Sequence, residues 1–448
     1  MQKNILMICY YYPPLIDVGC KRSVAFSKYF KKHGWVPYVL SVRNPDKTYC
    51  LIGNDQPPKG VITKYSYSII NPYRFAGKLN GLYTRIMRAF NVETNRNYFY
   101  DLLCIPDLFW GWIPLAALDG LKIIRRKQID LIYVSCSPFS SSFIGIILKI
   151  LTKQPLIIDF RDIYALETQT AGYSYAKPHF RKQFDLWLEK NMLKWADLFV
   201  VTTEEMRDLY VNRYGQHASK IYTIHNGFEA GELSAINVPH KKYSKFTIIY
   251  SGNFYSNANE PNIFFQALAL LRKRNKIHEG IFQFLYYGGE TKHFKQISKK
   301  LGIEDLVVAH SYIPHETLLG VIQRSHLCLI RIMKPMISTK LFESIVLNIP
   351  ILAIIPSGEA EKLIKEFSPS SYVITESSPE KAAEAILDAM GKYGQSQIEA
   401  NHVAEFLDHF SRENLTLKFM KLVENKIPPT KSSLNRSRNP SKKCYRII

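Results

Sequence analysis

The sequence predicts an α/β protein built from two successive sets of parallel-strand units. An apolar run over residues 4–12 has the length of a strand, and a predicted helix (24–32) and a second strand (37–42) follow it. A similar alternation restarts at Phe246, after a polar segment over 231–245. Strands that alternate with helices favour parallel sheets covered by helices, so we expect two domains of this kind.

Composition excludes several classes of protein. The chain has 448 residues, of which 46% are hydrophobic, and this is enough for two or three packed domains. The seven cysteines form no CxxC pair and no histidine cluster is present, so we expect neither a metal site nor a disulfide framework, and a reduced, cytoplasmic setting. No apolar run reaches membrane-spanning length. The formal net charge of +21 indicates an anionic partner or surface.

The rest of the first half continues the alternation. Residues 43–100 are harder to order, but Leu82–Phe90, with Arg85 and Arg88, predicts a basic amphipathic helix. Surface patterning and docking on an anionic membrane both remain open for this helix. Further along, the pattern predicts a helix over 118–127, a strand over 130–134, a helix over 180–195, and a strand followed by a capped helix over 195–206.

Two candidate ligand positions lie in this half. Arg161 and Asp162 come directly after a buried strand, at the strand end where open α/β sheets bind ligands. The alternative is a structural ion pair of Arg161 with Asp159 or Asp162, and both interpretations remain open. Gly19 follows the first strand, but no GxGxxG is present, so the residues alone favour a turn glycine.

The second half holds the strongest single pattern. A strand from Phe246 leads into a Gly252-Asn253 turn and a helix from about 261, and Arg331 follows a strand over 326–330. Next comes STKLFESIVLNIPILAIIP, in which Ser338 is an N-cap, and Pro350 separates the predicted helix from a buried strand.

This helix is expected to be amphipathic. Its apolar positions recur at helical spacing, and the polar face is expected to carry Thr339, Lys340 and Glu343. Backbone N–H groups at its start, beside Lys340, suit a diphosphate, and Glu343 can accept hydrogen bonds from a ribose diol. An ordinary amphipathic helix with a solvated glutamate is the alternative.

Four segments together resemble family 4 (group 1) glycosyltransferases, which have the GT-B fold. They are YYYPPLIDVGCKRS, DLIYVSCSPFSSSFIGIILK with PLIIDFRDIY, IYTIHNGFE, and STKLFESIVLNIPILA. The resemblance implies two Rossmann-like domains whose parallel sheets face each other across a cleft. The expected domains are 1–236 on the acceptor side and 237–410 for the sugar nucleotide. Residues 400–426 are expected to be helical, and the part over 411–426 is expected to return to the first domain. The basic stretch 427–448 is expected to be a disordered tail.

The resemblance also assigns roles to residues. The catalytic positions that we carry forward are Arg161 and Asp162, because of their place at the end of the strand in the DFRD segment. The donor-binding set that we carry forward is Gly19, Gly252, Asn253, Ile313, Arg331, Ser338, Thr339, Lys340 and Glu343.

The sequence departs from the family pattern at several positions. Pro335 replaces a first glutamate, Cys20 a second glycine, and Asn253 and Asn259 a basic pair. We therefore expect the donor's charge to be neutralised by Arg331, Lys334 and Lys340.

The expected activity is transfer of a hexose from a nucleotide-sugar donor to a cell-surface polysaccharide or lipid-linked glycan. The resemblance implies retention of configuration, and we expect no cofactor and no metal. Two alternatives remain: a GT-B nucleotide-sugar epimerase and a non-enzymatic basic binding protein. No nucleic-acid module is recognisable, so we expect no nucleic acid as partner. The expected location is the cytoplasm, with peripheral binding at the inner face of the membrane as an extension.

Overall fold

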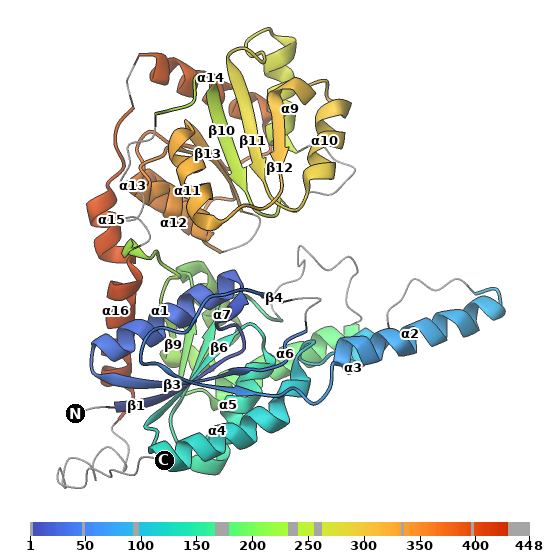
Figure 1. Cartoon of the computed structure of the whole chain (residues 1–448), viewed down its shortest axis with the longest axis vertical. Helices are drawn as coiled ribbons and strands as arrows, with labels where there is room; N and C mark the ends of the chain where they lie inside the picture. Colours follow the sequence, from blue (N-terminus) through green and yellow to red (C-terminus); the bar gives the residue numbers. More distant parts are fainter. Residues whose placement is uncertain are drawn as a thin grey trace. The chain divides into compact units, whose positions relative to one another are not determined.

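The computed structural model describes residues 3–46, 50–92, 98–165, 179–231, 241–254, 262–332, 336–395 and 398–428. The chain divides into two compact units (Figure 1). One runs to His225 and resumes at Leu415, and the other comprises Asn226–Asn414. The first division therefore falls before the predicted boundary at 236/237, and the second falls after 410. Most of the predicted linker (232–240) and the tail from 429 on lie outside the described residues.

Seven parallel strands form the sheet of the first unit. Their order is β5-β3-β1-β6-β7-β8-β9. They are β1 (Lys3–Cys9), β3 (Trp35–Val42), β5 (Ile62–Ser66), β6 (Leu131–Cys136), β7 (Leu156–Phe160), β8 (Leu198–Val201) and β9 (Ile221–Thr223). The chain moves outward from β1 to β3 and β5, then returns to β6 on the other side of β1. The predicted βαβ opening is confirmed, and the order reverses between β1 and β6, where such sheets bind ligands.

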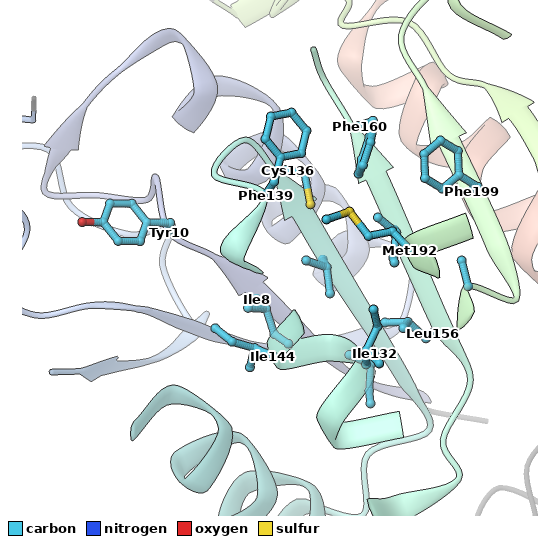
Figure 2. Packing of buried hydrophobic residues seen from close by; sticks show 14 of the residues in the cluster. Ile8, Tyr10, Ile132, Cys136, Phe139, Ile144, Leu156, Phe160, Met192 and Phe199 are labelled. Carbon is cyan, nitrogen blue, oxygen red and sulfur yellow. The ribbon is translucent and has the colours of Figure 1, made fainter. Parts of the chain in front are cut away.

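Helices cover both faces of this sheet. They are α1 (Val18–Lys32), α2 (Pro72–Ala89), α3 (Tyr98–Leu103), α4 (Ile113–Lys127), α5 (Ser140–Thr152), α6 (His179–Trp195), α7 (Glu204–Arg213) and α16 (Arg412–Lys426). Two short strands, β2 (Leu15–Ile16) and β4 (Leu51–Ile52), pair antiparallel. On one face, Ile8, Ile132 and Leu156 of three neighbouring strands pack with Ile144 of α5 and Met192 of α6 (Figure 2).

The opposite face is covered partly by the end of the chain. Phe419 of α16 lies 5.1 Å from Phe26 and 5.7 Å from Phe30, both on α1, and 5.8 Å from Tyr133 of β6, measured between ring centroids. These side chains are almost completely buried. Burial of apolar rings from both ends of the sequence therefore ties α16 to the first unit.

The second unit repeats the architecture with six parallel strands. Their order is β12-β11-β10-β13-β14-β15. They are β10 (Phe246–Ser251), β11 (Phe282–Tyr287), β12 (Val307–His310), β13 (Leu327–Arg331), β14 (Ile351–Ile354) and β15 (Tyr372–Ile374). The helices are α9 (Ile263–Lys273), α10 (Thr291–Lys300), α11 (His315–Arg324), α12 (Thr339–Val346), α13 (Glu359–Phe367), α14 (Pro379–Gly394) and α15 (Val403–Phe410). Here the strand order reverses between β10 and β13, and the predicted α/β class with parallel sheets is confirmed.

Several predicted elements differ in their bounds from the observed ones. The helix expected at Leu82–Phe90 is the second half of α2, which begins at Pro72. The helix expected over 400–426 is two helices, α15 and α16, separated at Ser411. Gly19 lies inside the first turn of α1, which Asp17 caps by accepting a hydrogen bond from the Gly19 N–H, so the expectation of a turn glycine is wrong.

Candidate functional site

The candidate site of the second unit lies where the strand order reverses. Gly252 and Asn253 follow β10, and Arg331 is the last residue of β13 rather than the residue after it. The Arg331 Nη1 donates a 2.7 Å hydrogen bond to the Phe254 carbonyl, and the guanidinium lies 4.8 Å from the Phe254 ring centroid. Burial lowers the pKa of Arg331. Arg331 therefore spans the switch point and brings a cation to the carboxyl ends of both strands.

Lys340 reaches the same edge from the first turn of α12. Ser338 is the N-cap as predicted, and its hydroxyl accepts from the Lys340 N–H at 3.3 Å. The Lys340 Nζ lies 4.4 Å from the Tyr250 ring centroid and 3.4 Å from its hydroxyl oxygen. Burial lowers the pKa of Lys340 to about 8, although the Glu343 and Glu290 carboxylates oppose the shift. The Lys340 ammonium group thus faces the Tyr250 ring and is partly shielded from solvent.

Gly252 makes room for this lysine. Its φ is +88°, a conformation that side chains rarely adopt, and a Cβ there would lie 3.0 Å from the Lys340 Nζ. The Gly252 N–H donates to the Tyr287 carbonyl at 2.7 Å. The turn at 252 therefore favours a glycine, and the absence of a side chain there leaves room for the Lys340 Nζ.

Glu343 is buried, so its expected position on an exposed polar face is wrong. Only 7% of the residue is exposed, and its Oε1 lies 3.0 Å from the Nε2 of His315, the first residue of α11. The expectation failed because α11 begins beside this side of α12. A polar partner at hydrogen-bond distance reduces the cost of burying this carboxyl group.

The neighbouring loops are tied together by short contacts. The Tyr312 hydroxyl donates to the Asn253 Oδ1 at 2.6 Å, and Ile313 follows, half-buried. The Gly288 N–H donates to the His310 carbonyl at 2.9 Å, and a Cβ at Gly288 would lie 2.6 Å from the Gly252 oxygen. The structure thus brings the loops after β10, β11 and β12 together.

The contacts described above bring together only part of the predicted donor-binding residues. Gly252, Asn253, Arg331, Lys340 and Glu343 all belong to the second unit and lie at or near the carboxyl ends of its strands. Thr339 is half-buried at the start of α12. Three positions that entered the sequence argument lie outside the described residues, namely Asn259, Lys334 and Pro335.

The arrangement suits a ligand with two negative charges. Arg331 and Lys340 present guanidinium and ammonium groups, and the positive end of the α12 dipole lies beside Lys340. Since partial burial weakens solvent screening, each cation interacts more strongly with an anion than it would on an open surface. Glu343 adds an acceptor for hydroxyl groups one turn further along.

In the first unit, Arg161 holds two loops together. Its Nε donates to the Cys136 carbonyl at 3.2 Å, and its Nη2 donates to the Ser137 carbonyl. A Cβ at Gly19 would lie 1.8 Å from the Arg161 Nη1, so only glycine fits beneath the guanidinium. The loops after β1, β6 and β7 therefore meet around Arg161, while Asp162 lies half-buried next to it.

Asp159 does not pair with Arg161, so the part of the structural alternative that named Asp159 is wrong. Arg22 of α1 binds it instead, with Nε–Oδ2 at 2.7 Å and Nη2–Oδ1 at 3.2 Å, and the Tyr133 hydroxyl donates to Asp159 at 2.5 Å. Arg22 also donates to the carbonyls of Ile224 and His225. This completely buried network fixes β7 against α1 and the end of β9.

Sequence reasoning missed three residues of these networks. Arg22 lies within the quoted GCKRS segment, and His315 within the YIPHE segment, but neither was given a role. Tyr312 stands in the same segment as His315. Their signals were polar side chains directly after a strand or at a helix start, which are common positions for unrelated reasons.

Neither a metal cluster nor a membrane-spanning helix is found among the described residues. No three His, Cys, Asp or Glu side chains in that part of the chain are placed to hold a metal ion together. Across the described helices, none combines the length and apolar character needed to cross a bilayer.

Two protein-family models match the chain. The Glycosyltransferase Family 4 model matches residues 88–231, and the Glycosyl transferases group 1 model matches residues 235–402. Together the two models match well over half of the chain, one in each half. A comparison with curated protein sequences gives no significant match.

Solved structures share the fold at low identity. HepE of Anabaena, in complex with UDP-glucose, has a TM-score of 0.62 and 14% identity, over 94% of this chain and 99% of that one. The lipopolysaccharide outer core galactosyltransferase WaaB, in its apo form, has a TM-score of 0.56 and 12% identity, over 95% and 100%. A putative UDP-N-acetylglucosamine 2-epimerase from Listeria monocytogenes has a TM-score of 0.54 and 11% identity, over 97% of this chain and 99% of that one. With both family models in chain order on two parallel-sheet units, the chain belongs to family 4, group 1, of the glycosyltransferases and has their GT-B fold.

Proposed function

We propose that the second unit binds a nucleotide-sugar donor through its diphosphate and its ribose. Lys340, Arg331 and the start of α12 would hold the diphosphate, and Glu343 would accept hydrogen bonds from the ribose hydroxyls. The observation that carries the proposal is the position of two half-buried cations at the switch point between β10 and β13. HepE, which has the same fold, was crystallised with UDP-glucose, and this supports a donor of that chemical class.

The proposed reaction is hexosyl transfer with retention of configuration. The bond between the sugar C1 and the diphosphate oxygen breaks, and a bond from C1 to an acceptor hydroxyl oxygen forms. The leaving diphosphate gains negative charge, and Lys340, Arg331 and the α12 dipole stabilise that charge as it develops. The acceptor proton passes to a base or to the leaving group. The proposal assigns no metal and no cofactor to this step, and turnover that is unchanged by a chelator is the expected result.

For the first unit, we propose different roles for Arg161 and Asp162. The Arg161 guanidinium donates hydrogen bonds to the Cys136 and Ser137 carbonyls. Its proposed role is therefore that of a positioning residue, which shapes the loops after β1 and β6. Asp162 keeps the catalytic assignment on the acceptor side, because it follows β7 and is still partly exposed. Gly19 contributes by giving Arg161 its space.

The proposed acceptor is a polysaccharide or lipid-linked glycan made at the cell surface or its inner face. WaaB, a galactosyltransferase of the lipopolysaccharide outer core, has the same fold and supports an acceptor of this kind. The proposed location is the cytoplasm, with peripheral association at the inner face of the membrane, since a net charge of +21 favours an anionic surface.

A thermal-shift panel of sugar nucleotides tests the donor proposal. A ligand that binds only the folded state raises the melting temperature, and the best donor should shift it in a concentration-dependent manner. Arg331→Ala should then weaken the sugar nucleotide far more than the bare nucleoside, because the arginine is proposed to face the diphosphate. Equal losses for both ligands would show that Arg331 is structural. A panel without any shift would contradict the donor site itself.

An epimerase is the second candidate function, because the putative epimerase from Listeria monocytogenes shares the fold. It would use the same donor site but no acceptor. Conversion of the sugar nucleotide in the absence of any acceptor, followed by NMR, would favour the epimerase. Turnover that requires an added glycan acceptor is the result expected from a transferase. The remaining alternative, a basic binding protein, would instead bind RNA or DNA tightly and salt-dependently, and would ignore sugar nucleotides.

A further inference from the structure

Helix α2 carries an exposed apolar stripe along its whole length. Phe75, Leu79, Leu82, Ile86 and Phe90 follow one another at intervals of three or four residues, which places them on one side of the helix. Phe75 is 48% exposed, Leu82 57%, Ile86 47% and Phe90 74%, whereas Leu79 between them is half-buried. Single exposed apolar residues are ordinary, but a continuous row of large ones marks an interaction surface.

The chain's own packing uses a different side of α2. Tyr73 stacks on Tyr100 with ring centroids 4.6 Å apart, and the Phe99 N–H donates to the Asn80 Oδ1 at 3.2 Å. A Cβ at Gly77 would lie 2.8 Å from the Tyr100 hydroxyl oxygen, which shows how closely α3 approaches. Figure 1 shows α2 extending away from the sheet of the first unit, beyond α3. The apolar stripe thus remains uncovered by the described part of the unit.

A basic flank runs beside the stripe. Lys78, Arg85 and Arg88 are exposed and lie next to the apolar positions around the helix. Neither Asp nor Glu occurs between Asp55 and Glu93. The surface of α2 therefore combines large apolar groups with an unopposed positive charge.

The exposed side of α6 has the same character. Phe180, Phe184 and Trp187 are exposed, with Phe184 and Trp187 stacked at 5.4 Å between ring centroids. The two acidic residues of this helix, Asp185 and Glu189, are buried inside the unit. The surface that α6 presents is thus aromatic, and it continues into the exposed Lys190 and Lys194.

We propose that the α2 stripe, meaning Phe75, Leu79, Leu82, Ile86 and Phe90 with the basic flank, docks on an anionic lipid bilayer. Apolar and aromatic side chains enter the interface between headgroups and acyl chains, while lysines and arginines beside them contact lipid phosphates. α6 provides a second contact of the same chemistry. A second copy of the chain fits less well, because two α2 surfaces would bring like charges together without any acidic partner. The inference rests on the peripheral membrane association proposed above and assigns it to a particular surface. Its test uses no sugar nucleotide, so it can fail while the proposed donor site stands.

Co-sedimentation of the full chain with vesicles tests the proposal. We expect binding to phosphatidylglycerol–phosphatidylcholine vesicles, little binding to pure phosphatidylcholine, and a progressive loss as salt rises. Leu82→Ser with Ile86→Ser should weaken binding at least tenfold, and so should Lys78→Gln with Arg85→Gln and Arg88→Gln. Matched controls lie in the second unit: Ile281→Ser with Val308→Ser, which are also exposed apolar residues, and Lys292→Gln with Lys295→Gln and Lys299→Gln on α10. These controls should bind like the unchanged protein.

A label on the stripe gives an independent readout. The six cysteines within the described residues are buried, so in a Cys444→Ser background an introduced Leu82→Cys can carry an environment-sensitive fluorophore. Its emission should shift to the blue with anionic vesicles, whereas a label at Val308→Cys should not. The proposal is overturned if the protein stays in the supernatant at low salt, if the control variants lose binding equally, or if the Leu82 label shifts only with protein concentration, which would indicate self-association. Each variant is first checked for an unchanged melting temperature.

Discussion

At the scale of single residues, the candidate donor site depends on groups that are charged but partly withdrawn from water. Lys340 lies against Tyr250, and Glu343 lies against His315. A ligand of opposite charge interacts more strongly with such a partly buried group than with the same group at the surface, because solvent screens the interaction less. The same burial makes each of these residues contribute to folding as well, so variants here require a stability measurement beside the binding measurement.

Glu343→Ala should weaken binding of the best sugar nucleotide. Loss of a charge-assisted hydrogen bond to the ribose costs roughly 1.5–3 kcal/mol, which corresponds to about tenfold or more in the dissociation constant. Because Glu343 is buried beside His315, we also expect a lower melting temperature, and titration calorimetry should be done well below it. Glu316→Ala, which changes an exposed glutamate next to His315, is the matched control. An unchanged dissociation constant for Glu343→Ala would remove this residue from the site.

Donor affinity should also fall as the pH rises above about 8. Burial lowers the pKa of Lys340 to about 8 in the free protein, and a bound diphosphate favours the protonated form, so its pKa is raised in the complex. Binding is therefore strongest below pH 8, where the lysine already carries its proton, and weakens toward tenfold per pH unit above it. Lys340→Arg keeps its charge throughout and should give a flat profile between pH 6.5 and 9.5. If donor affinity falls with pH in Lys340→Arg as it does in the unchanged protein, a group other than Lys340 causes the pH dependence.

At the scale of helices and strands, local patterns in the sequence predicted the regular alternation well. The buried strands and the capped helix α12 have short-range signals, namely apolar runs and Ser338 followed by helical spacing. The start of α2 had one too: Asn71 caps the helix by accepting from the Arg74 N–H, and Pro72 occupies its first turn. That signal was present in the sequence and was overlooked among the turn-forming residues around it.

What could not be predicted depends on partners far away in the sequence. The break at Ser411 has no proline or glycine. It arises because the Arg412 N–H donates to the Phe228 carbonyl, and the Phe228 N–H donates to that of Phe410. Arg22 and Asp159 are 137 residues apart, and only the folded sheet brings them together. The edge at which Gly252, Arg331 and Lys340 gather was predictable, because parallel strands end together, but the contacts among these residues were not.

Gly19→Ala tests how tightly α1 and Arg161 are packed. The added Cβ would overlap the Arg161 guanidinium, which must move and release the Cys136 and Ser137 carbonyls. Overpacking of this kind typically costs about 1–3 kcal/mol of stability, so the melting temperature should fall. Gly391→Ala in α14, where a Cβ meets nothing within 4 Å, is the matched helical control and should be neutral or stabilising. Equal melting temperatures for the Gly19 variant and the unchanged protein would contradict this packing.

At the scale of the whole molecule, one fully buried carboxylate of the first unit links three of its parts. The Glu189 carboxylate on α6 accepts from the Ala165 N–H at 2.8 Å, and from the hydroxyls of Tyr210 and Tyr214, each at 2.9 Å. Tyr210 belongs to α7, and Ala165 follows the loop after β7. Because the residue has no exposed surface, its protonation state should affect the stability of the entire unit.

Stability of the first unit should therefore decrease between about pH 4.5 and pH 7. Burial raises the pKa of Glu189 from 4.5 to about 7, against the opposing effect of its three hydrogen-bond donors. Within this window the folded state holds a proton that the unfolded state has released. The stabilisation is thus complete below pH 4.5 and is lost as the pH rises through 7. A shift of this size corresponds to roughly 3 kcal/mol.

Glu189→Gln stays neutral and should lose this contribution to the pH dependence. In urea denaturation at pH 5 and pH 7.5, the variant should gain stability relative to the unchanged protein on going to the higher pH, by an amount approaching the figure above. Comparing the two proteins at each pH cancels the titration of all other groups. Glu384→Gln, an exposed glutamate on α14, is the control and should follow the unchanged protein. If Glu189→Gln shows the same difference between the two pH values as the unchanged protein, Glu189 is ionised in the folded state across this range, and its three donors outweigh its burial.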